Sequence, residues 1–278
     1  MDSGRTPAKG LRRRSVGDFA SEWCLAEGRL KMSLPYLSIV IPAYNEEKRL
    51  PMAIPQVAAY AATKGDFEII VVDDGSTDGT ARVAAELAKQ YPQLRLISYK
   101  PNRGKGGAVR EGMLAAQGRY VLFADADQST PITELDKLLP KLEREGYDIA
   151  IASRRLPDSE VLMGQSRGRR LASRLFWLAV QALALRGVAD TQCGFKCMRR
   201  EVAQKVFPQV KTNTPIFDVE MLIVATREGC RVAEVPVRWI HDHDTRIPYN
   251  LRRAMATAAE LMRVLWRHRV FHPLRIRQ

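Results

Sequence analysis

The stretch FEIIVVDDGSTDGT, from Phe67 to Thr80, decides the fold prediction for this chain of 278 residues. It opens with a short apolar, β-branched run, which is typical of a buried strand, and ends in a turn that leads into a helical pattern. Similar apolar runs predict strands over Ser38–Pro42, Phe67–Asp73, Leu94–Tyr99, Arg119–Ala124 and Asp148–Ala152, and helical patterns occupy Glu46–Thr63, Thr80–Gln90, Ala108–Gln117 and Ile132–Glu145. This alternation predicts an α/β fold with a mostly parallel central sheet flanked by helices.

The second half of the chain is less regular. Its periodicity predicts helices over Gly168–Leu185 and Phe217–Glu228 and strands over Gln192–Met198 and Arg231–Trp239. The pattern is sharper over Leu251–Trp266, where apolar residues recur at i, i+3, i+4 and i+7 with arginines between them. This last segment is predicted to be an amphipathic helix.

The positive charge of the chain is concentrated in three segments. Lysine and arginine number 44 against 31 aspartate and glutamate residues, which gives a net charge of +13. Residues 1–32 carry a net +3, residues 154–175 a net +4 and residues 245–278 a net +7, so the remainder is close to neutral. Such charge can meet nucleic acid, an anionic membrane or phosphorylated substrates. No zinc-finger, RNP or basic-zipper pattern occurs, so the sequence disfavours nucleic acid as a partner.

The cysteines and the apolar segments bear on location. The four cysteines form no Cys-x-x-Cys pair of the zinc type, which favours a reducing compartment. The longest uncharged apolar stretch near a basic segment, Leu175–Leu185, has 11 residues, against the roughly 20 that a membrane span needs. Residues 1–34 lack an apolar signal segment and are predicted to form a disordered basic leader. We therefore expect a cytoplasmic protein that is peripheral at the cytoplasmic face of a membrane.

Carboxylates follow two of the predicted strands. Asp73 ends one strand, where an acidic residue in dinucleotide-binding folds accepts hydrogen bonds from a ribose. Asp125 and Asp127 close another strand, and the alternation of an extended chain points both side chains to one side. Two carboxylates placed in this way suit Mg²⁺ or Mn²⁺, which can bridge a diphosphate. Because ligands of parallel sheets bind beyond the carboxyl ends of the strands, these residues are candidates for a site.

Two other segments carry candidate ligands. Asn102–Gly107 (NRGKGG) precedes a helix, and glycines with a lysine at a helix N-terminus favour phosphate. This segment matches neither the P-loop nor the dinucleotide fingerprint, and no nucleophile-elbow or zincin motif occurs in the chain. The pair His241 and His243 could supply a metal ligand, although a solvated loop is the favoured interpretation.

Five motifs occur in a fixed order: IVIPAYNE (39–46), VVDDGSTDGT (71–80), NRGKGGAVREG (102–112), DAD (125–127) and DTQCGFK (190–196). With them the chain resembles the inverting family-2 glycosyltransferases of the GT-A fold, the nucleotide-diphospho-sugar transferase fold. Within that family it is most similar to the dolichyl-phosphate β-glucosyltransferases and their bacterial polyprenyl-phosphate relatives. DTQCGFK is the most specific part, because many family-2 enzymes share the other motifs.

The resemblance implies a role for each matching residue. It implies that the substrates are bound by Pro42, Ala43, Tyr44, Glu46, Asp73, Lys105, Asp125, Arg155, Gln192 and Arg246, with the first five around the nucleoside. It implies Asp127, Arg154 and Asp190 as catalytic residues and Asp125 and Asp127 as metal ligands. Related mannosyl enzymes continue the acidic motif with Leu-Gln, but this chain has Gln128-Ser129, so it departs from their third metal ligand.

The implied reaction is transfer of a hexose, with glucose as first choice, from UDP-glucose to a polyprenyl or dolichyl phosphate with inversion. A phosphate monoester is largely a dianion at neutral pH, so it needs arginines rather than a general base. One alternative is a soluble family-2 enzyme with a hydroxyl acceptor, for which Asp190 is the candidate base. Another is a GDP-mannose-dependent polyprenyl-phosphate mannosyltransferase. A binding module without turnover is disfavoured because the acidic motif is intact.

These inferences divide the chain into a leader (1–34), a GT-A catalytic domain (35–246) and an amphipathic basic C-terminal helix and tail (247–278). The catalytic domain is predicted to have a donor half (35–153) and an acceptor half (154–246). The basic segments flank the implied acceptor entrance, so the charge indicates a phosphate-bearing lipid at an anionic membrane surface. The C-terminal helix could lie in that interface, pack onto the domain, or do both. The sequence leaves the oligomeric state open.

Overall fold

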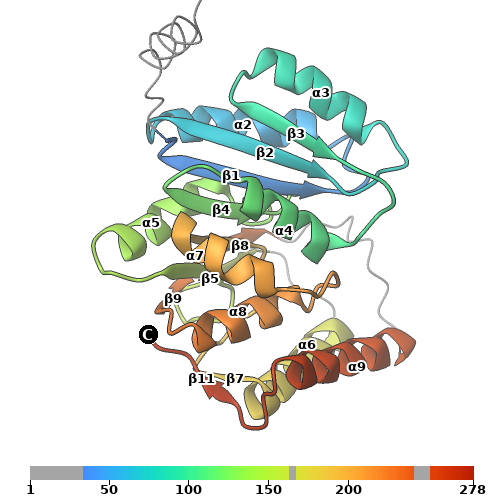
Figure 1. The fold of residues 1–278 in the computed structure, drawn as a ribbon, viewed down its shortest axis with the longest axis vertical. Coiled ribbons are helices and arrows are strands. Elements are labelled where there is room, and N and C mark those ends of the chain that lie inside the picture. The colour runs from blue at the N-terminus through green and yellow to red at the C-terminus, as the bar shows by residue number, and fades with distance from the viewer. Residues whose placement is uncertain (1–33, 163–166, 241–250) are drawn as a thin grey trace, which may run out of the picture. The chain divides into compact units, whose positions relative to one another are not determined.

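The central sheet decides where the motifs lie. In the computed structural model, which describes residues 34–162, 167–240 and 251–278, seven strands form one sheet in the order β3-β2-β1-β4-β8-β5-β9 (Figure 1). Of these, β8 is antiparallel to both neighbours and the others are parallel. The predicted mostly parallel sheet is therefore confirmed. Its strands are β1 (Leu37–Ala43), β2 (Phe67–Asp73), β3 (Leu94–Ser98), β4 (Tyr120–Ala124), β5 (Ile149–Ser153), β8 (Phe195–Arg199) and β9 (Val232–Pro236).

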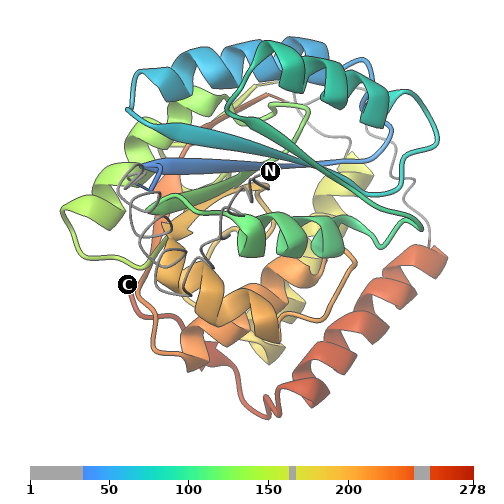
Figure 2. The ribbon, with the colours of Figure 1, turned by 45° about the horizontal axis from the view of Figure 1, so that its top comes forward.

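Helices cover both faces of the sheet (Figure 2). The strands supply both faces because successive side chains point to opposite sides: in β1, Ile39 and Ile41 lie in one core and Val40 in the other. Each fully buried Val or Ile stabilises the fold by about 1.5–3 kcal/mol, so the strand ends rest on a rigid base. One face carries α2 (Leu50–Ala62), α3 (Thr80–Gln90) and α5 (Leu135–Glu143), and the other carries α4 (Lys105–Ala115), α7 (Arg200–Val206) and α8 (Phe217–Arg227).

The helix α8 lies in the interior and separates the sheet from the last helix. Its residues Phe217 to Ala225 are all buried, and two of them are carboxylates. Beyond α8, at the opposite end of Figure 1 from α3, lie α6 (Arg167–Leu183) and α9 (Leu251–Arg267). The expected C-terminal helix is thus present, and it contributes Leu261, Val264 and Leu265 to the core around α8.

Several predicted element boundaries need correction. The strand expected over Arg231–Trp239 is two strands, because Pro236 lacks an N–H donor and the chain then leaves the sheet. The second of them, β10 (Arg238–Ile240), pairs instead with β6 (Glu160–Leu162). The strand expected from Gln192 begins only after the 190–194 turn. The remaining short elements are η1 (Ile132–Glu134), β7 (Leu185–Arg186), η2 (Phe207–Gln209) and β11 (Leu274–Arg275), and β7 pairs with β11.

Among the described residues, no helix combines the length and the apolar character that crossing a bilayer requires. The predicted leader falls outside the described residues, and the division into donor half, acceptor half and C-terminal segment stays a prediction.

Candidate active site

The carboxyl ends of the strands bring the predicted motifs to one edge of the sheet. The register pairs Ala43 of β1 with Asp73 of β2, and β4 runs parallel on the other side of β1. Asp125 therefore leaves the sheet at the same edge as Asp73. Because β8 runs the opposite way, its first residue, Phe195, pairs with Ala124, and the 190–194 turn that precedes it reaches this edge too. This is where ligands bind in open α/β sheets.

Asp125 is held between a lysine and a glycine. Its Oδ1 lies 2.6 Å from Lys105 Nζ, and its backbone N–H donates to the Gly194 carbonyl oxygen at 3.1 Å. A Cβ atom on Gly194 would lie 2.0 Å from Asp125 Oδ2, which is closer than atoms can approach. A side chain at position 194 would therefore displace the Asp125 carboxylate, and this favours the glycine of the DTQCGFK motif. Burial lowers the pKa of Lys105, but the charges of Asp125, Asp218 and Asp127 offset this and leave it raised.

Asp127 places a second carboxylate beside Asp125. It is exposed, its Oδ1 accepts the Ser129 N–H at 2.9 Å, and the left-handed backbone of Gln128 (φ 51°) turns the chain between them. Desolvation and the charge of Asp125 raise the pKa of Asp127, so the two carboxylates repel each other although Lys105 pairs with Asp125. Two carboxylates could hold Mg²⁺ or Mn²⁺, and such an ion would need further oxygen ligands from phosphates or water. Within the described ranges, no group of three His, Cys, Asp or Glu side chains could hold a metal ion.

Asp73 and Asn45 link the two loops that were predicted to surround the nucleoside. The Asp73 side chain is buried and accepts the Ser76 N–H at 3.1 Å and the Ser98 hydroxyl at 2.8 Å. Asn45 has a left-handed backbone (φ 57°); its N–H donates to Ser76 Oγ and its Oδ1 accepts the Thr77 N–H, each at 2.9 Å. Asn45 was not predicted, although asparagine between two motif residues is a signal for left-handed backbone.

The other predicted nucleoside contacts are the last two residues of β1, Pro42 and Ala43, and two residues that follow it, Tyr44 and Glu46. Tyr44 is 44% exposed, whereas Ala43 is buried. Glu46 accepts a hydrogen bond from Arg49 Nη1 at 2.8 Å, and its N–H donates to Thr80 Oγ1 at 2.7 Å. The structure thus places these residues beside the β2 loop that follows Asp73. Their contact with a nucleoside stays a prediction for Pro42, Ala43, Tyr44 and Glu46.

Asp74 supports the glycine-rich turn, a role that the sequence did not indicate. Its two carboxylate oxygens accept the N–H groups of Arg103 at 2.7 Å and Gly104 at 2.8 Å. Its carbonyl oxygen accepts the Asn102 side-chain amide at 2.8 Å. Lys105, the residue after Gly104, begins α4. Asp74 therefore fixes the turn from which Lys105 reaches Asp125.

Arg154 and Asp190 form a two-pronged ion pair at the end of β5. Arg154 Nε lies 2.6 Å from Asp190 Oδ2 and Nη2 lies 2.9 Å from Oδ1, and the guanidinium also lies 5.3 Å from the Trp239 ring centroid. Burial alone would raise the pKa of Asp190. The Arg154 guanidinium and the N–H groups of Arg154 and Gln192 outweigh burial and hold it at about 2. The structure therefore favours a positioning role for Asp190, in which its carboxylate holds Arg154 in place. A role as proton acceptor is disfavoured.

The remaining predicted phosphate and sugar contacts take other directions. Arg155 Nη2 donates to Ser173 Oγ at 2.6 Å, so this arginine is directed toward α6. Burial lowers the pKa of Arg155. Gln192 Nε2 donates to the Pro215 carbonyl oxygen at 3.0 Å and braces the loop before α8. Arg246 and the histidine pair of the sequence analysis lie outside the described residues.

A buried lysine and aspartate beneath the site were missed by the sequence analysis. Lys196 of β8 is fully buried, and its Nζ donates to the Cys193 carbonyl oxygen at 2.6 Å and to Asp218 Oδ1 at 2.5 Å. Burial raises the pKa of Asp218, although Lys196 and Lys105 counteract it. The available signal was a lysine in a strand whose other residues are mostly apolar. A charge at such a position requires a partner.

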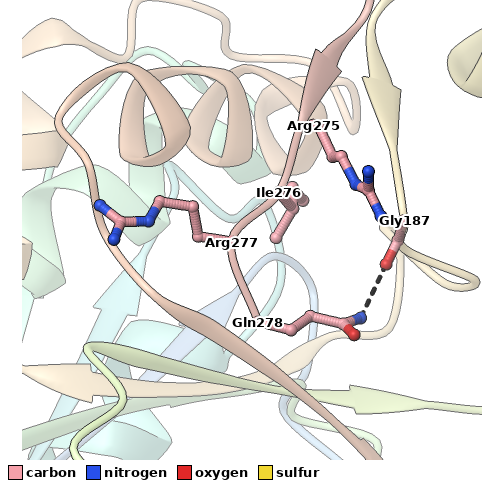
Figure 3. Close-up of a pocket in the computed structure, with 5 residues that line it drawn as sticks. All are labelled: Gly187, Arg275, Ile276, Arg277 and Gln278. Carbon is pink, nitrogen blue, oxygen red and sulfur yellow. Dashed lines mark hydrogen bonds between the residues drawn. The ribbon is translucent and has the colours of Figure 1, made fainter.

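A hollow of about 550 Å³ lies elsewhere, at the end of the described chain (Figure 3). It is lined by Gly187 and residues 275–278, and the Gln278 side-chain amide donates to the Gly187 carbonyl oxygen at 2.9 Å. None of the predicted site residues lines it. We therefore take the carboxyl edge of the sheet as the candidate active site.

Comparison with known proteins identifies the family of the chain. The model of glycosyl transferase family 2 matches residues 38–207. A dolichyl-phosphate β-glucosyltransferase of Dictyostelium discoideum is 34% identical over 257 residues, which cover 88% of this chain and 78% of that protein. The protein of the same name from Drosophila melanogaster is 41% identical over 73% of this chain and 66% of its own length, and the human one is 38% identical over 73% and 67%.

Solved structures show the same fold. Glucosyl-3-phosphoglycerate synthase from Mycobacterium tuberculosis, in complex with Mn²⁺, UDP and glucosyl-3-phosphoglycerate, superposes with a TM-score of 0.63 at 20% identity, covering 95% of this chain and 87% of that one. Mannosyl-3-phosphoglycerate synthase from Rubrobacter xylanophilus gives 0.59 at 24% identity, covering 87% and 76%. The chain belongs to glycosyl transferase family 2, and it is a glycosyltransferase of the GT-A fold.

Proposed function

We propose that this glycosyltransferase transfers glucose from UDP-glucose to a polyprenyl phosphate of the dolichyl type, with inversion at the anomeric carbon. The observation that carries the proposal is the 34–41% identity to four proteins named dolichyl-phosphate β-glucosyltransferase, over 73–88% of this chain. The arrangement of the candidate site supports it, because the site contains separate groups suited to a donor diphosphate and to an acceptor phosphate.

Asp125, Asp127 and Lys105 are the residues proposed to act on the donor diphosphate. Asp125 and Asp127 would hold Mg²⁺ or Mn²⁺, which supplies positive charge for a departing diphosphate. The synthase of Mycobacterium tuberculosis described above contains Mn²⁺ together with UDP. Lys105 adds a second positive charge at the N-terminus of α4, where backbone N–H groups and the helix dipole also favour phosphate.

The acceptor half needs a nucleophile but no base. The dianionic phosphate of the lipid attacks the anomeric carbon, a new carbon–oxygen bond forms, the bond to the β-phosphate breaks and UDP leaves with its electron pair. Arginine carries five N–H donors, of which Asp190 engages two on Arg154, so others can meet the acceptor phosphate. The pKa of about 2 makes Asp190 a weak proton acceptor, which favours a phosphate over a hydroxyl acceptor.

Exposed apolar side chains on α6 and α9 indicate where the lipid would approach. Met255, Met262 and Trp266 are spaced seven and four residues apart, so they share one side of α9, and Trp266 is 80% exposed. Leu175 and Leu178 are exposed on α6. A different side of α9 packs into the core, so the alternative in which the helix packs onto the domain is confirmed. The exposed side is compatible with an additional contact to a membrane.

We further propose that the exposed apolar side of α9, formed by Met255, Met262 and Trp266, rests on an anionic membrane. Apolar patches of this kind mark interaction sites on soluble domains. The net charge of +7 over residues 245–278 complements anionic lipid, at about 1 kcal/mol for each basic residue near the surface. A lipid phosphate acceptor would then reach the active site from the membrane surface at which its phosphate lies.

Transfer of labelled sugar tests the proposed function. The full chain is incubated with labelled UDP-glucose or GDP-mannose, with and without polyprenyl phosphate, and with Mn²⁺ or EDTA. We expect organic-extractable label only with UDP-glucose, lipid acceptor and metal together. Label from GDP-mannose would replace the proposed donor. Transfer to a water-soluble hydroxyl compound without lipid would favour the alternative acceptor.

A further inference from the structure

Glu220 is a buried carboxylate that the reaction described above does not use. It lies in the interior of α8 and is fully buried. Its Oε2 accepts the N–H groups of Lys211 at 3.0 Å and Thr212 at 2.6 Å, and its Oε1 lies 2.7 Å from both Arg267 Nη1 and His268 Nε2. One carboxylate therefore joins the end of α9 to the loop that precedes α8.

That loop presses against the glycine-rich turn. The Gly106 N–H donates to the Asn213 carbonyl oxygen at 2.9 Å. A Cβ atom on Gly106 would lie 2.4 Å from the Thr212 carbonyl oxygen, and one on Gly104 would lie 2.6 Å from the Asn213 carbonyl oxygen. The turn and the loop thus touch backbone to backbone, with no side chain between them to absorb a shift. Lys105, which reaches Asp125, lies between these two glycines.

Arg267 reinforces the connection from the side of α9. Besides Glu220, its Nη1 donates to Thr212 Oγ1 at 3.1 Å. The path from the end of α9 to Lys105 therefore consists of Arg267, Glu220, the loop at Thr212 and the turn. Each step is a hydrogen bond or a close backbone contact. A displacement of Arg267 is therefore expected to move the glycine-rich turn as well.

We propose that Glu220, Thr212 and Arg267 form a positioning clamp that seats the glycine-rich turn for the donor diphosphate, so that the end of α9 sets the affinity for the nucleotide sugar. This inference rests on the proposed function for the identity of the donor. It adds a role for residues far from every donor motif in the sequence. It also joins the proposed membrane surface on α9 to the donor site by a continuous physical path.

Binding of UDP-glucose tests the clamp without any lipid acceptor. Calorimetric titration in the presence of Mn²⁺ compares the wild type with Arg267→Ala and Arg263→Ala. Arg263 lies one turn earlier on α9, is 70% exposed and pairs with Glu260, so its removal changes the charge of the helix equally. We expect Arg267→Ala to raise the Kd roughly 3- to 30-fold, the range of long-range couplings, and Arg263→Ala to leave it within twofold.

Two further variants separate positioning from general damage. Thr212→Val removes one hydrogen bond and is expected to raise the Kd in the same direction with no loss of folded protein, and Arg267→Lys should recover part of the affinity. In turnover, Arg267→Ala should raise the KM for UDP-glucose while kcat at saturating donor stays within about threefold. An unchanged Kd for both Arg267→Ala and Thr212→Val, or an equal rise for Arg263→Ala, overturns the clamp. If the wild type binds a different nucleotide sugar, the proposed donor is wrong, and the same variants judge the clamp on that sugar.

Discussion

Two pairs of aspartates lie at the ends of the strands β2 and β4, which lie on either side of β1, at the same edge of the sheet, and the protein surrounds the two pairs differently. Asp73 and Asp74 are buried, and their oxygens accept hydrogen bonds from serines and from backbone N–H groups. Asp125 and Asp127 face each other's charge, with Lys105 as the paired cation of Asp125. Identical side chains at equivalent strand ends thus stabilise loops in one case and, in the other, place two carboxylates side by side with one lysine paired to Asp125.

The contrast shows that the residue type at a strand end does not reveal its role. The partners decide it. A carboxylate whose acceptor capacity is filled by the protein stabilises the fold, whereas one that repels its neighbour costs stability and is therefore a candidate for binding a ligand. This distinction leads to four predictions. The first compares activity with stability, the next two concern the free energy of unfolding, and the last compares membrane binding with stability.

The largest effect is expected on activity, at Asp127. Asp127→Asn keeps the size of the side chain and removes its charge, so transfer from UDP-glucose should fall by about 10²- to 10³-fold, as for loss of one preorganised electrostatic group. Thermal unfolding should occur at the same or a slightly higher temperature, because repulsion from Asp125 is relieved. Turnover that is undiminished, with intact folding, would remove Asp127 from the reaction.

The second effect concerns the carboxylate that pairs with Arg154. Asp190→Asn should lower the free energy of unfolding by about 3 kcal/mol at pH 7, because Arg154 loses a largely buried partner. The pKa of Asp190 is lowered from 3.8 to about 2 by folding, so its stabilisation is complete above pH 4 and is lost as the pH falls toward 2. Urea unfolding at several pH values should show the wild type and the variant converging below pH 4. A constant difference down to pH 2.5 would contradict the assignment.

A smaller effect on stability is expected at Asp74, where the same aspartate-to-asparagine substitution can be made as at Asp127. Asp74→Asn replaces one acceptor of the glycine-rich turn by an amide that faces an N–H group, at a cost of about 1–3 kcal/mol in the free energy of unfolding. Chemical denaturation of the two variants side by side measures the contrast. If Asp74→Asn were neutral and Asp127→Asn destabilising, the comparison between the two pairs would be reversed.

Much of the fold and of the site could be predicted from the sequence, because the signals there are local. Apolar runs of strand length and the turn residues that end them depend on neighbours within a few positions, so the parallel sheet and the convergence of the motifs follow. The family itself follows from motifs that are contiguous in the chain. Shorter elements such as α7 and β6 carry too few residues for a period and were missed.

What could not be predicted depends on contacts between distant segments. The pair Lys196 and Asp218 is separated by 22 positions, and Glu220 meets Arg267 across 47. No local pattern specifies that a charge in an apolar strand or helix will find its partner there. For the same reason the sequence suggested Arg154 and Asp190 as separate functional residues, whereas the structure joins them in one ion pair.

The smallest effect on stability is expected on α9, where the same contrast recurs between adjacent apolar side chains. Leu265 is buried in the core and Trp266 is 80% exposed. Trp266→Ser should change the free energy of unfolding by no more than about 0.5 kcal/mol, because the indole contributes little to the core.

If α9 rests on a membrane, the same change removes the 1.5–3 kcal/mol that burial of a large apolar side chain supplies, so flotation with anionic vesicles at low salt should weaken about tenfold or more. Leu265→Ser should do the opposite and destabilise the fold by about 2–5 kcal/mol. Flotation that is absent in the wild type, or unchanged in Trp266→Ser, would leave the exposed side of α9 without the proposed lipid partner, and the basic C-terminal segment would then have to act on the acceptor phosphate alone.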